Sequence, residues 1–176
     1  MTPKPTKNVT EIARELGRYS LDAFEFLHRG LDFTVQKIHG PPDEMLLKLV
    51  KWMDENDVDS DRLDIMLDQD ELPRIVAVAI EHYGGPAGLR ERMNRHVGGE
   101  DLCWGLRDYS LNQWGLMAPS VLRSWGLQST MDFGRMVFAL VENDLLQKQP
   151  DDSIRDFEDV YDFDKAFGDA YRIRLN

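Results

Sequence analysis

The stretch from Trp104 to Leu127, WGLRDYSLNQWGLMAPSVLRSWGL, contains the tripeptide Trp-Gly-Leu three times. Glycine readily adopts the left-handed conformation that ends many helices, and a leucine directly after it can pack back on the last turn. We therefore predict that one helix ends at Gly115 and another at Gly126. Gly105 falls inside a predicted helix, where glycine costs about 1 kcal/mol relative to alanine, so it is either a close-packing point or a coincidence.

Three helices are expected around these glycines. The first spans 100–114 and begins with an acidic pair, which the helix dipole favours in a first turn. The second is short, covers 119–125 and opens with a proline. The third follows a cap at Ser129 or Thr130, and its apolar residues recur at helical spacing.

A small β-hairpin is expected after the third helix. Leu145–Lys148 is interpreted as an extended segment, residues 150–152 have turn composition, and the alternation in Phe157–Phe163 predicts a returning strand. Three helices followed by a hairpin resemble a winged helix-turn-helix. We therefore expect a mainly α protein with a winged-helix-like part at residues 95–176.

The first half of the chain, residues 9–94, is predicted to be helical behind a flexible tail at residues 1–8. Apolar residues recur at three and four positions in 21–38 and again in 43–55, which indicates amphipathic helices. The apolar run within 73–83 fits a buried helix or a buried strand. Its length and its leading proline favour a helix, whereas its β-branched residues favour a strand; we interpret it as a helix.

The segment 54–71 is the most acidic of the chain. Its aspartates alternate as the first ligands of an EF-hand loop do, at positions 57, 59 and 61. Arg62 stands where that loop needs glycine, and Asp68 replaces its bidentate glutamate. We therefore interpret the segment as an acidic linker around a short helix at Leu63–Leu67, and predict no metal ion or cofactor for the chain.

Composition restricts the compartment and the partners. The chain has 176 residues, a net charge of -11 and one cysteine, Cys103, which excludes an intramolecular disulfide. The sequence predicts neither a signal peptide nor a membrane span. A reducing cytoplasm fits these features, while nucleic acids and anionic membranes are disfavoured as partners.

Several short segments carry a resemblance to a known family. They are Arg18-Tyr19, Arg95 to Leu102, Val121 to Leu127, Thr130 to Gly134, Val137-Phe138, Leu140 to Glu142, Asp156-Phe157 and Asp162-Phe163. On these segments the chain resembles a small uncharacterised bacterial family known mainly from planctomycetes and verrucomicrobia. The stretch from Gly40 to Asn94 does not match and is either an insertion or a divergent helical part. Because the family has no assigned function, the resemblance implies no activity.

The charges argue against DNA binding, the usual function of a winged helix. The recognition-helix surface would consist of Ser129, Thr130, Asp132 and Arg135, which offers one cation and one anion. Residues 150–169, which include the expected wing, hold eight acidic and two basic side chains. A DNA-binding face needs lysines and arginines against the phosphates, so a transcription regulator is only our alternative hypothesis.

The sequence contains no recognisable catalytic constellation. The four histidines are not paired at metal-ligand spacing, and no serine or cysteine has a base at a recognised spacing. Cys103 lies between apolar residues, which predicts a buried, inert thiol. Arg95, His96 and Glu100 form a candidate polar cluster at a helix start. Free N–H groups there could hold an anion, although Glu100 could simply answer the helix dipole.

Three functional hypotheses follow. The first is a protein-interaction or scaffolding module without catalysis, which binds a partner protein or a second copy of itself. The second is a winged-helix transcription regulator, and the third is an enzyme whose site is assembled from distant residues. An exposed apolar surface would favour the first, and a basic strip across the third helix the second.

Overall fold

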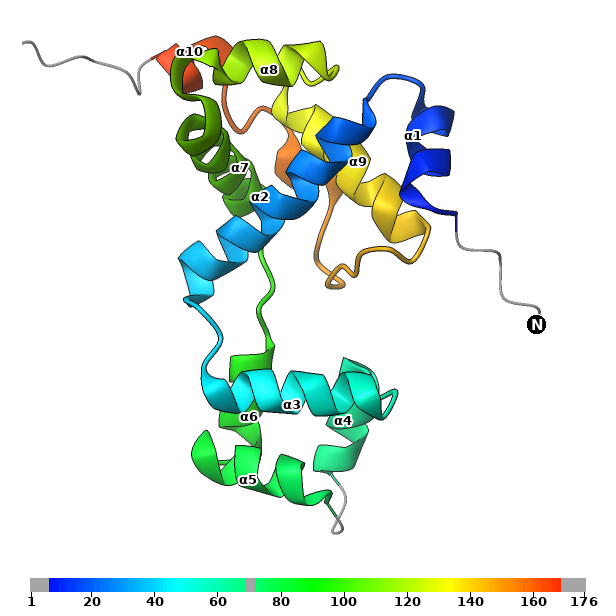
Figure 1. Ribbon diagram of the computed structural model, residues 1–176, viewed down its shortest axis with the longest axis vertical. Coiled ribbons are helices and arrows are strands. Elements are labelled where there is room, and N and C mark those ends of the chain that lie inside the picture. Colours follow the sequence, from blue (N-terminus) through cyan, green and yellow to red (C-terminus); the bar gives the residue numbers. More distant parts are fainter. Residues whose placement is uncertain (1–6, 69–71, 169–176) are drawn as a thin grey trace, which may run out of the picture. The chain divides into compact units, whose positions relative to one another are not determined.

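The structure, a computed structural model, describes residues 7–68 and 72–168. Within these two ranges every regular element is a helix and no β-strand occurs, so the mainly α fold class is confirmed. The chain forms two compact units, whose helices are labelled in Figure 1. Unit 1 comprises Met1–Ile38 and Val97–Asn176, and unit 2 comprises His39–His96.

Unit 1 is built from α-helices and short 3-10 turns. They are α1 (Val9–Leu16), α2 (Leu21–His39), α7 (Gly99–Trp114), η1 (Gly115–Met117), α8 (Ala118–Ser124), α9 (Thr130–Glu142), η2 (Ile154–Phe157) and α10 (Phe163–Gly168). The three helices expected around the repeated tripeptide correspond to α7, α8 and α9. Asn8, at the end of the expected flexible tail, caps α1 by accepting the N–H of Glu11 at 3.0 Å; residues 1–6 lie outside the described ranges.

Two of the repeated glycines end helices, as expected. α7 stops before Gly115, which adopts a φ of 51°. Gly126 follows α8 with a φ of 90°, and the N–H of Leu127 donates to Leu122 O at 3.0 Å, the long bond of a Schellman cap. Leu127 is buried whereas Leu116 is exposed, so only the leucine after Gly126 packs back on its helix.

The remaining glycine, Gly105, is a close-packing point between α7 and α2. A Cβ atom at Gly105 would overlap with the side chain of Thr34, and a Cβ atom at Gly30 would overlap with that of Leu106. Thr34 also donates its hydroxyl to Gly30 O at 2.6 Å. The two helices therefore approach closely because each presents a glycine at the contact.

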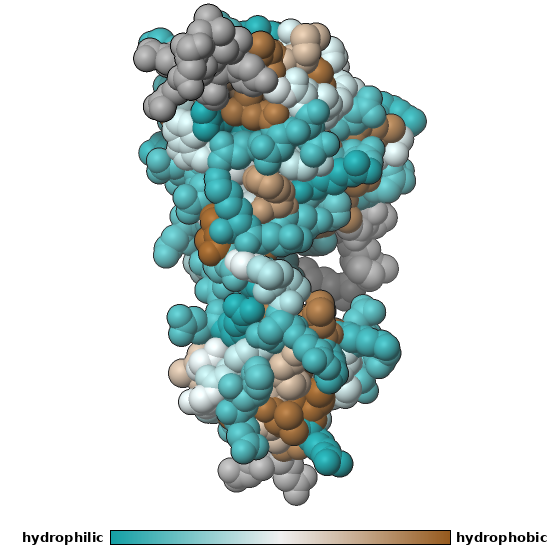
Figure 2. Space-filling view, turned by 60° about the vertical axis from the view of Figure 1, so that its left-hand side comes forward, coloured by the Kyte–Doolittle hydropathy of each residue, from teal (hydrophilic) through white to brown (hydrophobic). Residues whose placement is uncertain are grey.

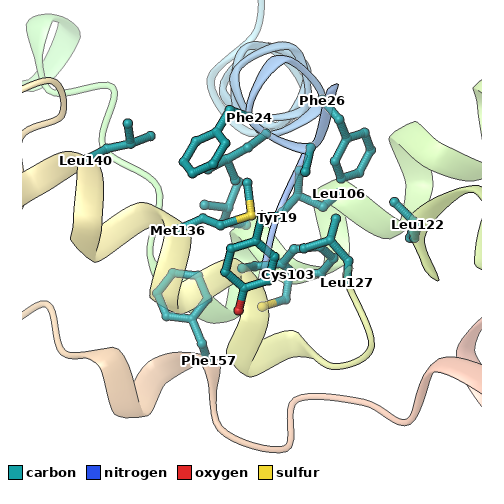
Figure 3. Close-up of a cluster of buried hydrophobic side chains, with 14 of the residues drawn as sticks. Tyr19, Phe24, Phe26, Cys103, Leu106, Leu122, Leu127, Met136, Leu140 and Phe157 are labelled. Carbon is teal, nitrogen blue, oxygen red and sulfur yellow. The ribbon is translucent and has the colours of Figure 1, made fainter. Parts of the chain in front are cut away.

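The core of unit 1 gathers side chains from α2, α7, α8 and α9 (Figure 3). Phe26 of α2 lies at the centre of its aromatic part. The Phe26 ring centroid is 5.8, 5.8, 5.9 and 6.3 Å from those of Tyr109, Trp114, Trp125 and Phe133. The tryptophans that precede Gly115 and Gly126 thus serve the core as well as the helix ends.

The prediction of a β-hairpin after the third helix is wrong. Leu145–Lys148 is bent and irregular, and the expected returning strand holds the end of η2, a turn and the start of α10. The backbone of residues 157–160 forms hydrogen bonds with α9 instead of with a strand. Thr130 Oγ1 donates to Phe157 O at 2.7 Å and accepts the N–H of Val160 at 3.3 Å. Gly134 leaves room for the Phe157 ring, since a Cβ atom there would lie 2.8 Å from that side chain.

Unit 2 has a separate core. Its helices are α3 (Glu44–Glu55), α4 (Ser60–Leu67), α5 (Arg74–His82) and α6 (Pro86–Met93). The fully buried side chains of this core are Leu49, Val76, Ala79 and Leu89. α5 confirms the helical interpretation of residues 73–83, whose β-branched Val76 packs inside this core.

The acidic segment encloses a short helix, as expected. Asp59 caps α4 by accepting the N–H of Arg62 at 2.8 Å. Asp59 is therefore the N-cap residue of α4. Residues 69–71 of the acidic segment lie outside the described ranges.

The two units divide the chain differently from the boundary at residues 94 and 95 that the sequence suggested. The helices α1 and α2 belong to the same unit as α7 to α10, and unit 2 is inserted between α2 and α7. Its limits, His39 and His96, enclose the stretch Gly40 to Asn94, for which the sequence left an insertion as one of two alternatives. No helix of the described ranges is long and apolar enough to cross a membrane.

Candidate functional site

The candidate polar cluster is distributed over both units. Arg95 and His96 belong to unit 2, and Glu100 lies in the first turn of α7 in unit 1. Within unit 2, Arg95 donates to Gly40 O, and His39 Nε2 is 2.8 Å from His96 O. These bonds join the beginning of unit 2 to its end. In the described ranges, no three or more His, Cys, Asp or Glu side chains are grouped to hold a metal ion.

Two residues of the expected recognition-helix surface are buried. The exposed fractions of Thr130 and Asp132 are 1% and 0%. Ser129 caps α9, and Arg135 is exposed but lies 3.0 Å from Asp132 Oδ1. A nucleic acid could reach only Ser129 and Arg135 of this set.

Asp132 is the centre of a buried polar network that joins α9 to the turn between α1 and α2. The hydroxyl of Tyr19 donates to Asp132 Oδ1 at 2.7 Å. The backbone N–H groups of Gln128 and Ser129 donate to Asp132 Oδ2 at 2.8 and 3.0 Å. Both carboxylate oxygens therefore have donors from more than one part of unit 1.

Two guanidinium groups complete the network. Arg18 Nη2 lies 3.3 Å and Arg135 Nη1 lies 3.0 Å from Asp132 Oδ1. Burial acts to raise the pKa of Asp132, but the Tyr19 hydrogen bond, the backbone donors and the Arg18 charge outweigh it, so that pKa lies below its usual value. Burial and the bond to Asp132 raise the pKa of Tyr19. Asp132 is an ionised, fully partnered carboxylate, which fits a structural role.

Sequence reasoning identified the members of this network but not the network. The capping role of Asp132 follows from its position after Ser129. Its bond to Tyr19 joins residues 113 positions apart, which no local pattern indicates.

Cys103 is buried, as the sequence predicts. Burial, and then the charge of Glu100, raise the pKa of its thiol to about 12. Because the thiolate is the reactive form of cysteine, this thiol is poorly suited to nucleophilic chemistry near neutral pH.

A partly exposed tryptophan on α7, beside a half-buried tyrosine of the segment before α10, is the feature that the sequence did not indicate. Trp104 is 39% exposed, unlike the tryptophans of the Phe26 cluster. Its ring centroid lies 4.7 Å from that of Tyr161, whose hydroxyl donates to Cys103 O at 2.8 Å. Tyr161 is thereby held in place, while the indole of Trp104 reaches the surface.

Carboxylates lie close in sequence to both members of this pair. Glu100 and Asp101 come one helical turn before Trp104 on the same face of α7, and Glu158 and Asp159 come shortly before Tyr161. All four are exposed, and their side chains form no ion pair or hydrogen bond within the described part of the chain. We define the Trp104 surface as Trp104, Tyr161, Glu100, Asp101, Glu158 and Asp159.

Other apolar side chains also reach the surface. On the face drawn in Figure 2 they form separate patches between polar residues. The most exposed large apolar side chains include Leu116 and Met117 of η1 and Ile65 of α4. Unlike Trp104, none of these three side chains is aromatic.

Comparison of the chain with protein-family models, with curated proteins and with solved structures finds no match in any of the three.

Proposed function

We propose that the protein is an interaction module without catalytic activity, and that the Trp104 surface is where it binds a partner protein. The observation that carries this proposal is the partial exposure of Trp104 beside a fixed tyrosine. Tryptophan and tyrosine combine a large apolar ring with a polar edge, and they dominate the binding energy of many protein interfaces.

The surrounding charges fit the rim of such an interface. Interfaces commonly have an apolar centre that is desolvated on binding and a polar rim that stays in contact with water. Trp104 and Tyr161 supply the centre, and the unpaired carboxylates supply part of the rim. Core packing does not account for Trp104, because its indole is exposed and it lies outside the Phe26 cluster.

The alternative of DNA binding has less support. Arg135 is the only basic residue of α9, and it is already paired with Asp132 at 3.0 Å. Residues 150–169 carry eight acidic and two basic side chains, which repel a phosphate backbone. The expected wing, the second element of that hypothesis, does not form a hairpin in the described ranges.

Site-directed photo-crosslinking tests the proposal. A photoreactive amino acid is placed at Trp104 and, as a control, at the exposed Glu142 near the end of α9, and cells that express either variant are irradiated. We expect a discrete protein adduct from position 104 that is absent from position 142. Adducts of equal pattern from both positions, or tight binding of duplex DNA with a steep salt dependence, would overturn the proposal.

A further inference from the structure

We infer that the partner of the Trp104 surface presents arginine or lysine side chains on an exposed protein segment. This inference rests on the interaction function proposed above and specifies the chemistry of the partner. It follows from the charges and the aromatic geometry of the surface.

The charges of the Trp104 surface favour a cationic partner. Glu100, Asp101, Glu158 and Asp159 are exposed and have no ion pair within the described part of the chain. A set of exposed charges of one sign attracts a partner of the opposite sign. Exposed charges attract over a screening length of about 10 Å at 0.1 M salt. Glu100 and Asp101 also occupy the first turn of α7, where the helix dipole would otherwise favour an anion.

The aromatic ring favours the same side chains. Arginine and lysine lay their apolar stems along an apolar surface while the charged head reaches polar groups beside it. A cation within about 6 Å of an indole centroid is also attracted by the ring. The chain contains one such contact already: the Arg107 guanidinium lies 5.6 Å from the Trp104 centroid, and its Nε donates to Ala166 O at 2.9 Å.

Other partners fit the surface less well. A purely apolar segment would cover Trp104 but leave the neighbouring carboxylates partly desolvated and unpaired. An acidic segment would face like charges. A segment with an arginine or lysine beside an apolar residue can cover the Trp104 ring and also pair with the carboxylates of the surface.

The test uses fluorescence anisotropy with a labelled peptide in which arginine alternates with alanine. The same peptide with citrulline in place of arginine is neutral but nearly identical in shape. We expect the full-length protein to bind the arginine peptide at least about tenfold more tightly than the citrulline peptide at 0.1 M salt. Binding should weaken as the salt concentration rises.

Variants separate the Trp104 surface from the net charge of the protein. Trp104→Leu keeps apolar bulk and all charges but removes the aromatic ring, and should weaken arginine-peptide binding about threefold to tenfold. Asp159→Asn removes one charge at the surface and should weaken binding about threefold. Thermal melts establish that each variant remains folded.

Asp144→Asn is the matched control. Asp159 and Asp144 are both exposed and both have a positive φ, 47° and 59°, a conformation that asparagine tolerates. Asp144 follows α9, a helix of 13 residues that begins at Thr130 beside Val160, so it lies about 20 Å along that helix from the Asp159 turn. This variant should bind the arginine peptide as the unaltered protein does.

Each outcome decides between the possibilities. Selective weakening by Trp104→Leu and Asp159→Asn, with Asp144→Asn unchanged, supports the inference. If Asp159→Asn and Asp144→Asn weaken peptide binding equally, or if Trp104→Leu does not weaken it, the peptide is attracted by the net charge of the protein alone. Either result overturns the inference. Equal binding of both peptides overturns the requirement for a cation, while a protein adduct at position 104 in the crosslinking experiment would still support the interaction function.

Discussion

The Asp132 carboxylate shows how one buried residue can connect parts of the chain that are distant in sequence. It is fully buried, yet it receives hydrogen bonds from Tyr19 and from the backbone before α9, and two guanidinium groups lie beside it. A buried charge is tolerated only when it is paired in this way. The network therefore fixes the turn between α1 and α2 against the start of α9.

Replacing Asp132 by asparagine should lower the free energy of unfolding at pH 7 by about 1 to 3 kcal/mol, because a neutral amide with one oxygen cannot accept all the hydrogen bonds that Tyr19 and the backbone N–H groups donate to the carboxylate. Chemical denaturation measures this loss. Tyr19→Phe removes one donor and leaves the charges in place, so its effect should be smaller. An Asp132→Asn protein as stable as the unaltered one would contradict a structural role for this carboxylate.

The same network predicts how stability depends on pH. Because the pKa of Asp132 is lower in the folded protein than in the unfolded chain, its contribution is complete above the unfolded value, about 3.9, and is lost as the pH falls through the folded value. The stability difference between the unaltered protein and Asp132→Asn should therefore narrow below about pH 4. Denaturation curves at several acidic pH values measure this difference, and a constant difference would contradict the prediction.

Substitutions at Gly105 and Gly126 provide a third prediction at the scale of single residues. Gly105→Ala should destabilise unit 1 by about 1 to 3 kcal/mol, although alanine is the better helix former, because its Cβ would overlap with Thr34. Gly126→Ala should cost a similar amount, since its Cβ would strike the backbone of Arg18 at a positive φ. In denaturant titrations, Gly98→Ser should be nearly neutral, because Gly98 has free space and precedes α7 as its cap.

At the scale of elements, sequence reasoning succeeded where local rules suffice. Glycine stops, caps and apolar periodicity located α7, α8 and α9 and the short helix α4. The strand predicted for Phe157–Phe163 does not form. The apolar residues alternate there because Phe157 and Phe163 are both buried in the core of unit 1. Sequence reasoning missed the Trp104 surface for a related reason: three identical tripeptides do not reveal which tryptophan is exposed.

The docking of the segment after η2 on α9 can be tested through Thr130. Thr130→Val keeps the shape of the side chain but removes the hydroxyl that bridges Phe157 O and Val160 N–H. We expect a loss of stability of about 1 to 3 kcal/mol and faster hydrogen exchange of the Val160 amide. Unchanged protection of that amide would show that the segment does not depend on this bridge.

At the scale of the whole molecule, the chain has two separate hydrophobic cores, one in each unit. The limits of these units differ from the single boundary that the sequence suggested. The core of unit 1 combines residues from both ends of the chain, whereas the core of unit 2 is continuous in sequence. An element inserted at a helix end can fold as its own unit when it buries its own apolar side chains.

The separate cores predict separate unfolding. Leu89→Ala removes a fully buried side chain of unit 2 and should lower the stability of that unit by about 2 to 5 kcal/mol. Leu127→Ala should do the same in unit 1. Hydrogen exchange at α5 reports on unit 2, and hydrogen exchange at α9 reports on unit 1. Leu89→Ala should accelerate only the exchange at α5 and Leu127→Ala only the exchange at α9, because neither side chain belongs to the other core. Equal acceleration of the exchange at α5 and α9 by either substitution would mean that the two units fold as one cooperative body.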